Sequence, residues 1–145
     1  MTEATHDAQR WLARWAGEPY AYLTTTGRRS GRPHRIEIWF GVWEGQMYLL
    51  AGSRERADWV RNLQAHAKIT VELGDETHVG TARVLAAGTV EDRRARELLV
   101  AKYQEGDNLD EWGRTALPVA IAFPTEGEPA ADAGSSSRGG QAAVG

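Results

Sequence analysis

Residues 20–42, YAYLTTTGRRSGRPHRIEIWFGV, decide the fold. The first part, Tyr20–Thr26, is rich in β-branched and aromatic residues and stops at a glycine, which is typical of a strand that enters a turn. A polar connection, residues 27–33, follows, and Arg35–Val42 then alternates between apolar and polar side chains. The sequence therefore predicts two strands joined by a tight basic turn.

The rest of the chain shows more hairpins than helices. Turn signals at Glu44-Gly45 and Gly74-Asp75 join further short strands. The expected strands are Met47–Ala51, Lys68–Leu73, Thr77–Leu85 with Val90 as its continuation, and Leu117–Phe123, which is apolar on both faces and so interior. The expected helices are Gln9–Ala16, Asp58–Ala67 with Val60, Leu63 and Ala67 facing the core, and Glu91–Tyr103.

These elements predict an α+β protein with an antiparallel barrel of about six strands and three peripheral helices, because closure removes exposed sheet edges. The 145 residues suit one domain, residues 1–124. The segment 125–145 contains three consecutive serines and almost no large apolar residue, and we expect it to be a disordered tail.

Composition excludes several classes of function. The net charge of -3 argues against bulk nucleic-acid binding. The chain has no cysteine, which excludes disulfides and thiol nucleophiles, and the four histidines lack metal-site spacing, so no metal is expected. No signal peptide or membrane-spanning stretch is apparent, which favours a cytoplasmic protein.

The basic turn is the densest candidate for chemistry. Arg28, Arg29, Arg32 and Arg35 fall within eight residues, and Gly27 and Gly31 permit the positive φ of an amide nest that binds anions. Forked guanidinium groups suit phosphates and carboxylates. The turn either anchors an anionic ligand or is a solvated loop, and its spacing matches neither a Walker nor a Rossmann motif.

A second candidate follows the strand Met47–Ala51. Ser53 and Arg54 lie in the loop after it, and Trp59 and Asn62 are neighbours on one face of the next helix. An indole and an amide beside such a loop could line a pocket for a flat heterocycle. The alternative is that both residues are structural: Trp59 packs within the fold, and Asn62 caps a loop.

The run LTTTGRRSGRP, residues 23–33, resembles the opening signature of the deazaflavin-dependent nitroreductase family of split β-barrel oxidoreductases. The similarity continues through Ala51–Arg54, the run WVRNLQA at 59–65, Lys68–Val71 and Arg114–Val119. It covers about residues 20–123.

The resemblance implies coenzyme F420, a deazaflavin with a phosphate and a polyglutamate tail, and hydride transfer from the reduced cofactor. It implies a cofactor site formed by Arg28, Arg29, Gly31, Arg32, Pro33, Ser53, Arg54, Trp59 and Asn62. No protein residue is expected to be catalytic in the covalent or acid–base sense, because the cofactor supplies the hydride. Trp39 and Trp112 are candidate walls of the substrate pocket.

We therefore expect reduced F420 to reduce a small electron-poor acceptor such as a quinone, an activated alkene or a nitro compound. The alternatives are a non-catalytic deazaflavin-binding protein and an FMN-dependent split-barrel oxidoreductase. Dimers are common among split barrels, so the sequence is compatible with a homodimer.

Overall fold

Seven strands form one antiparallel sheet in the computed structural model, which describes residues 10–104 and 109–124. The strand order across the sheet is β2-β1-β5-β6-β7-β4-β3, and every pairing is antiparallel. The strands are β1 (Ala21–Thr26), β2 (Pro33–Ile38), β3 (Gly41–Trp43), β4 (Gln46–Ala51), β5 (Lys68–Leu73), β6 (Glu76–Val84) and β7 (Leu117–Ala122). The expected α+β split barrel is confirmed, with one strand more than predicted.

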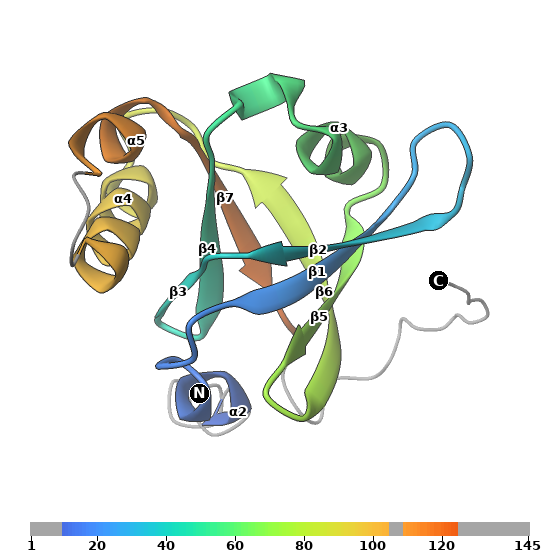
Figure 1. Ribbon diagram of the computed structural model, residues 1–145, viewed down its shortest axis with the longest axis horizontal. Coiled ribbons are helices and arrows are strands. Elements are labelled where there is room, and N and C mark those ends of the chain that lie inside the picture. Colours follow the sequence, from blue (N-terminus) through green and yellow to red (C-terminus); the bar gives the residue numbers. More distant parts are fainter. Residues whose placement is uncertain (1–9, 105–108, 125–145) are drawn as a thin grey trace.

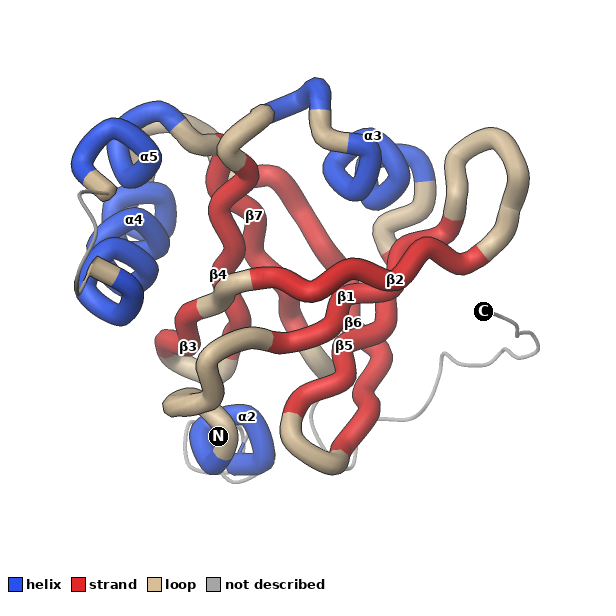
Figure 2. Tube along the Cα trace, in the orientation of Figure 1, coloured by secondary structure: helices blue, strands red, loops and turns tan. Residues whose placement is uncertain are grey.

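The two outermost strands of this sheet, β2 and β3, are consecutive in the chain. Only Trp39 and Phe40 separate them, and three Cα–Cα steps span at most about 11 Å. The ends of a seven-stranded ladder can come this close only if the sheet curls round on itself, as Figures 1 and 2 show. The short link therefore forces the barrel-like shape.

This link corrects the prediction of one continuous strand over Arg35–Val42. At the break, the backbone of Phe40 pairs with α4 (Val90–Tyr103) instead of a strand: its N–H donates to Tyr103 Oη (3.1 Å), and its carbonyl accepts from Lys102 Nζ (3.1 Å). The Phe40 side chain is fully buried. Two side chains of one helix thus end the ladder and redirect the chain.

The main core fills the inside of the curl. Large apolar side chains from β1, β4, β5 and β7 meet there with Phe40, for example Leu23, Leu49, Ile69 and Ile121. A second cluster on the outer face of β4 and β7 packs against Ala95 and Leu99 of α4. The prediction that Leu117–Phe123 is an interior strand is confirmed, because Leu117 to Ile121 are all buried.

The helices lie around the outside of the curled sheet (Figure 1). The short helix α2 (Arg10–Arg14) lies at the end where β5 turns into β6, α3 (Asp58–Ala65) follows a 3-10 turn η1 (Arg54–Arg56), and α4 lies beside α5 (Asp110–Thr115). The described residues thus contain four α-helices rather than the three expected, because residues 110–115 are also helical.

Two further expectations are corrected. Helix α3 ends at Ala65, since His66 is extended (φ -137°), and Ala67 is therefore exposed and outside the core. Val90 begins α4 and does not continue a strand, because Thr89 Oγ1 accepts a hydrogen bond from the Asp92 N–H (3.1 Å) as an N-cap.

The expected disordered tail, 125–145, lies outside the described residues. Among the helices of the described part, none has the length and apolar character needed to cross a membrane. Residues 10–104 and 109–124 also contain no group of three potential metal-ligating side chains.

Gly74, in the β5–β6 turn, allows α2 and the segment after it to pack closely. It has φ +63°, and a Cβ there would lie 2.5 Å from the Trp15 indole. We expect Gly74→Ala to lower the free energy of unfolding by about 2–4 kcal/mol, from left-handed strain plus overpacking. The matched change Gly88→Ala, at φ +83° in open space, should cost only about 1 kcal/mol. Equal losses in urea denaturation would contradict this contact.

Lys102 gives the fold a pH dependence. Its Nζ donates to the carbonyls of Ala16 (3.0 Å) and Phe40 and lies 3.5 Å from the Phe40 ring centroid, and burial lowers its pKa from 10.5 to about 8. Between these values the unfolded chain binds a proton that the folded chain does not, so stability should rise with pH in this window.

Compared with Lys102→Met, the wild type should gain about 1–2 kcal/mol of unfolding free energy between pH 7.5 and 9.5, a figure reduced for solvent screening. The exposed Lys68, changed to Met, is the control and should show no such difference. Parallel pH profiles for the wild type and Lys102→Met would show that burial does not perturb this amine.

Candidate functional site

A cleft of about 430 Å³ opens between α3 and the turn that joins β1 to β2. Its floor comes from the strands on either side of the turn, and its wall comes from the helix. The residues that line it are Thr25, Gly27, Arg28, Arg29, Ser30, His34, Ile36, Asp58, Trp59 and Asn62. The sequence indicated two separate stretches, the basic turn at residues 27–33, called the arginine turn below, and the start of α3. Both line this one cleft.

Asn62 ties the turn to α3. Its side chain is buried, and Oδ1 accepts from the backbone N–H of Arg28 (3.1 Å) and from Arg28 Nη1 (2.8 Å). Its Nδ2 donates to Thr25 Oγ1 (3.1 Å), which is also buried. Both ends of this amide are therefore used inside the protein, in a bridge from helix to strand and turn.

The turn is closed by its own hydrogen bonds. Gly27 N–H donates to the Arg32 carbonyl (2.8 Å), Gly31 N–H to the Gly27 carbonyl (2.9 Å) and Arg32 N–H to Ser30 Oγ (3.0 Å). A Cβ at Gly27 would lie 2.6 Å from Ser30 Oγ and 2.7 Å from His34 Nε2, so these two side chains would have to move to admit a larger residue. Across the described residues, the N–H groups of Arg29 and Ser30 are the turn's amides without a hydrogen-bond partner.

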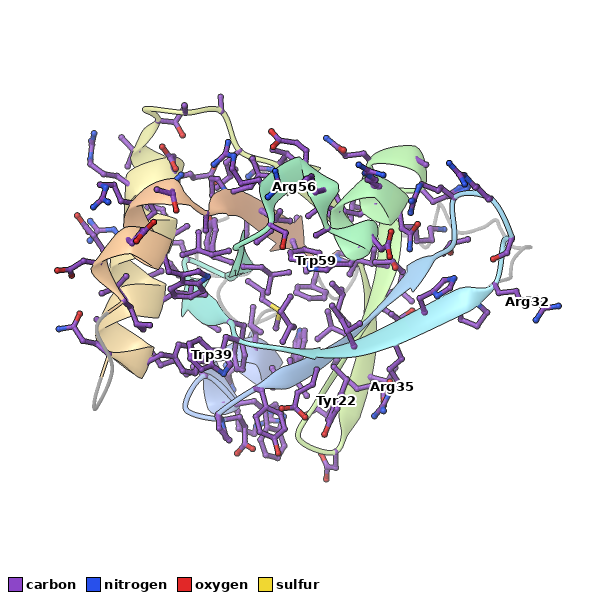
Figure 3. All side chains as sticks on the ribbon, turned by 45° about the horizontal axis from the view of Figure 1, so that its top comes forward. Tyr22, Arg32, Arg35, Trp39, Arg56 and Trp59 are labelled. Carbon is purple, nitrogen blue, oxygen red and sulfur yellow. The ribbon has the colours of Figure 1, made fainter. Side chains whose placement is uncertain are left out.

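The predicted cofactor residues divide into those that line the cleft and those that do not. Arg28, Arg29, Trp59 and Asn62 line it. Gly31, with φ +75°, Arg32 and Pro33 are exposed at the tip of the turn, and Figure 3 shows Arg32 pointing away from the body of the protein.

Ser53 and Arg54 lie outside the lining as well. Ser53 precedes η1 and makes no side-chain capping bond. Arg54, at φ +53°, donates from Nη1 to the Thr115 carbonyl (2.6 Å) and so connects η1 to the end of α5.

Trp39 and Trp112, the predicted substrate-side residues, come together in a second place. The Trp39 ring stacks on Tyr103 (centroids 4.2 Å apart, 2° between planes) and meets Trp112 edge-on at 5.6 Å. A Cβ at Gly52 would lie 3.5 Å from the Trp112 ring. This aromatic cluster of Trp39, Tyr103 and Trp112 lies at the bend after β2, at the opposite end of that strand from the arginine turn (Figure 3).

Sequence reasoning did not predict the remaining lining residues as site residues: Thr25, Gly27, Ser30, His34, Ile36 and Asp58. Thr25 had a signal, because it shares a face of β1 with Leu23, so a polar group there must be buried and paired. Asp58 is four residues before Asn62 and so lies on the same helix face. The sequence contains no comparable signal for His34.

The chemistry of the cleft suits a ligand that is flat at one end and anionic at the other. Trp59 and Ile36 supply apolar surface, and Arg28 and Arg29 supply positive charge beside the two free amides. Such a set of donors fits a deazaflavin with a phosphate, since guanidinium groups and amides bind phosphate oxygens and an indole binds a ring face.

Comparison with known proteins agrees with this chemistry. The model of the family described as F420H(2)-dependent quinone reductase matches residues 3–124. Among solved structures, the F420-H2 dependent reductase FDR-A is 25% identical, with 72% of this chain and 93% of that chain covered at a TM-score of 0.59.

Two further structures share the fold. The heme storage protein HutZ from Vibrio cholerae is 13% identical, over 82% of this chain and 92% of its own, at a TM-score of 0.65. A domain-swapped dimer is 23% identical, over 80% and 93%, at 0.59. Homodimer formation by this chain stays a prediction.

The match over most of the chain identifies the family. This chain belongs to the F420H2-dependent quinone reductase family, and it is an F420H2-dependent oxidoreductase whose cofactor is coenzyme F420.

Proposed function

We propose that the cleft between α3 and the β1–β2 turn holds reduced F420 and that the enzyme passes its hydride to a small electron-poor acceptor, such as a quinone, an activated alkene or a nitro compound. The observation that carries this proposal is that Trp59 and Arg29 line one cleft although they are thirty residues apart in the sequence. The bound cofactor supplies a two-electron hydride. The protein supplies binding, orientation and charge.

Trp59 is assigned to the deazaflavin ring. It is half-buried and packs against the edge of the core with Val84 and Ala57, so its indole is held in place before a ligand arrives. A fixed aromatic surface binds a planar ring with little loss of side-chain entropy.

Arg29 is assigned to the anionic part of the cofactor. Its side chain is exposed and has no hydrogen bond or ion pair within the described residues, in contrast to Arg28. The N–H groups of Arg29 and Ser30 have no hydrogen-bond partner within the described residues, which makes this part of the turn suitable for a phosphate group. Gly31, Arg32 and Pro33 at the tip, and Ser53 and Arg54 beside η1, are proposed to act at the edges of this site.

The acceptor is proposed to lie toward the aromatic cluster. Trp39 is among the exposed large hydrophobic residues of the described chain, and its ring is fixed by Tyr103 and Trp112. Aromatic walls favour flat, electron-poor acceptors through stacking.

Binding of F420 tests both assignments. We expect Arg29→Ala to weaken F420 binding about 3- to 10-fold at low salt and to flatten its salt dependence, because one charge-assisted contact is lost. Trp59→Ala should weaken binding at least about tenfold, and Trp59→Phe less, since an aromatic face remains. Isothermal titration calorimetry at two salt concentrations measures these effects.

Arg93→Ala is the matched control, because Arg93 is an exposed arginine on α4, outside the cleft. It should leave F420 affinity unchanged. If Arg29→Ala behaved like Arg93→Ala and Trp59→Ala bound F420 normally, the cleft would not be the cofactor site. Tighter binding of FMN than of F420 by the wild type would contradict F420 as the ligand of this cleft.

The bridge through Asn62 gives a stability prediction for the site. Thr25→Val keeps the shape of the side chain but leaves Asn62 Nδ2 without its acceptor, at a cost of about 1–3 kcal/mol. Thr24→Val, on the outward face of the same strand, should change the unfolding free energy by less than about 0.5 kcal/mol. Urea denaturation compares them, and equal effects would show that the buried hydrogen bond adds little.

A further inference from the structure

Arg28 differs from the other arginines of the turn because both arms of its guanidinium group are occupied. Nη1 donates to Asn62 Oδ1 (2.8 Å), and Nη2 donates to Asp58 Oδ1 (3.2 Å). Three-quarters of the side chain is buried, while Arg29 beside it is exposed. In this arrangement each Nη of Arg28 already donates one hydrogen bond inside the protein, so an anion that binds there competes with Asn62 or Asp58.

The two contacts of Arg28 differ in how readily they break. Asn62 is 4% exposed and is itself held by Thr25, so its contact with Arg28 is part of the folded structure. The Asp58 side chain is 84% exposed and touches Arg28 through one oxygen. An exposed ion pair of this kind contributes little to stability and breaks readily.

Asp58 also changes the charge of the cleft. It is the acidic residue among the side chains that line the cleft, against Arg28 and Arg29. An anion that approaches therefore meets a site in which one of two positive charges is already paired. The negative charge of the Asp58 carboxylate repels an anionic ligand in the cleft and leaves the binding of a neutral ligand almost unaffected.

We propose that Asp58 is a specificity-determining residue that serves as an exchangeable counter-ion: an anionic group of the bound ligand takes the place of Asp58 at Arg28 Nη2, while Asn62 holds Arg28 in position throughout. The inference rests on the proposed function, because it takes the phosphate and tail carboxylates of F420 as the anionic group. Asp58 then sets how strongly the cleft prefers anionic ligands, and it prevents an unpaired arginine in the empty site from binding other phosphates tightly.

The test compares Asp58→Asn with the wild type for two probes, F420 and a deazaflavin that lacks the phosphate and the glutamates. We expect the variant to bind F420 about 3- to 10-fold more tightly at low salt, with a steeper salt dependence, because the competing carboxylate is gone. Its affinity for the deazaflavin without the tail should not change. Asp75→Asn, which removes an exposed acid from the β5–β6 turn, is the charge-matched control and should leave both affinities unchanged.

A double-mutant cycle shows whether Asp58 acts through Arg28. In an Arg28→Gln background, Asp58→Asn should tighten F420 binding less than it does alone, because the released guanidinium group is absent. Asp58 is largely exposed, so all variants are first compared for thermal unfolding.

Each outcome decides between the proposals. Unchanged or weaker F420 binding by Asp58→Asn, or an equal change for both probes, would overturn the role of Asp58 while leaving F420 in the cleft. Failure of the wild type to bind either probe would overturn the placement of F420 as well. Tighter binding of F420 alone, with coupling to Arg28, is the result that the proposal requires.

Discussion

The two-residue link between β2 and β3 is the constraint on which the rest of the structure depends. These strands are the first and last of a seven-stranded ladder, and Trp39 and Phe40 alone connect them. A flat sheet of seven strands would place its edges roughly 28 Å apart, at about 4.8 Å per strand, which two residues cannot span. The curl and the enclosed core follow from this link.

Side chains of α4 stabilise the link. Tyr103 Oη also donates to the carbonyl of Pro19 (2.8 Å), and Lys102 Nζ reaches the carbonyl of Ala16, so the same two residues bind the bend and the segment before β1. Backbone groups that leave a ladder must find other partners, because an unpaired buried amide or carbonyl is costly. Loss of solvent disfavours the charged form of an amine, and the lowered pKa of Lys102 reflects its partial burial.

The sequence predicted the antiparallel architecture and much of the site, for physical reasons. Alternation and turn residues are local signals, and they located all the strands except the break at Trp39–Phe40. That break depends on Tyr103, sixty-three residues from Phe40, which no local pattern around residues 35–42 encodes. The arginine turn and the Trp59–Asn62 face were each visible in the sequence, but the hydrogen bond from Arg28 to Asn62, across thirty-four residues, becomes evident only in three dimensions.

Strand β2 connects the two places where the sequence predicted ligand contacts. This six-residue strand extends about 17 Å, from Pro33 beside the arginine turn to Ile38 beside the bend that carries Trp39. The polar end offers Arg29 and two free amides, and the apolar end offers a fixed stack of aromatic rings. In the proposed arrangement F420 occupies the polar end, with its anionic part at Arg29 and its ring on Trp59, and a flat acceptor lies toward the apolar end. The proposed cofactor and acceptor sites therefore lie along one strand, and the exchangeable pair of Arg28 and Asp58 lies where that strand's charged end meets α3.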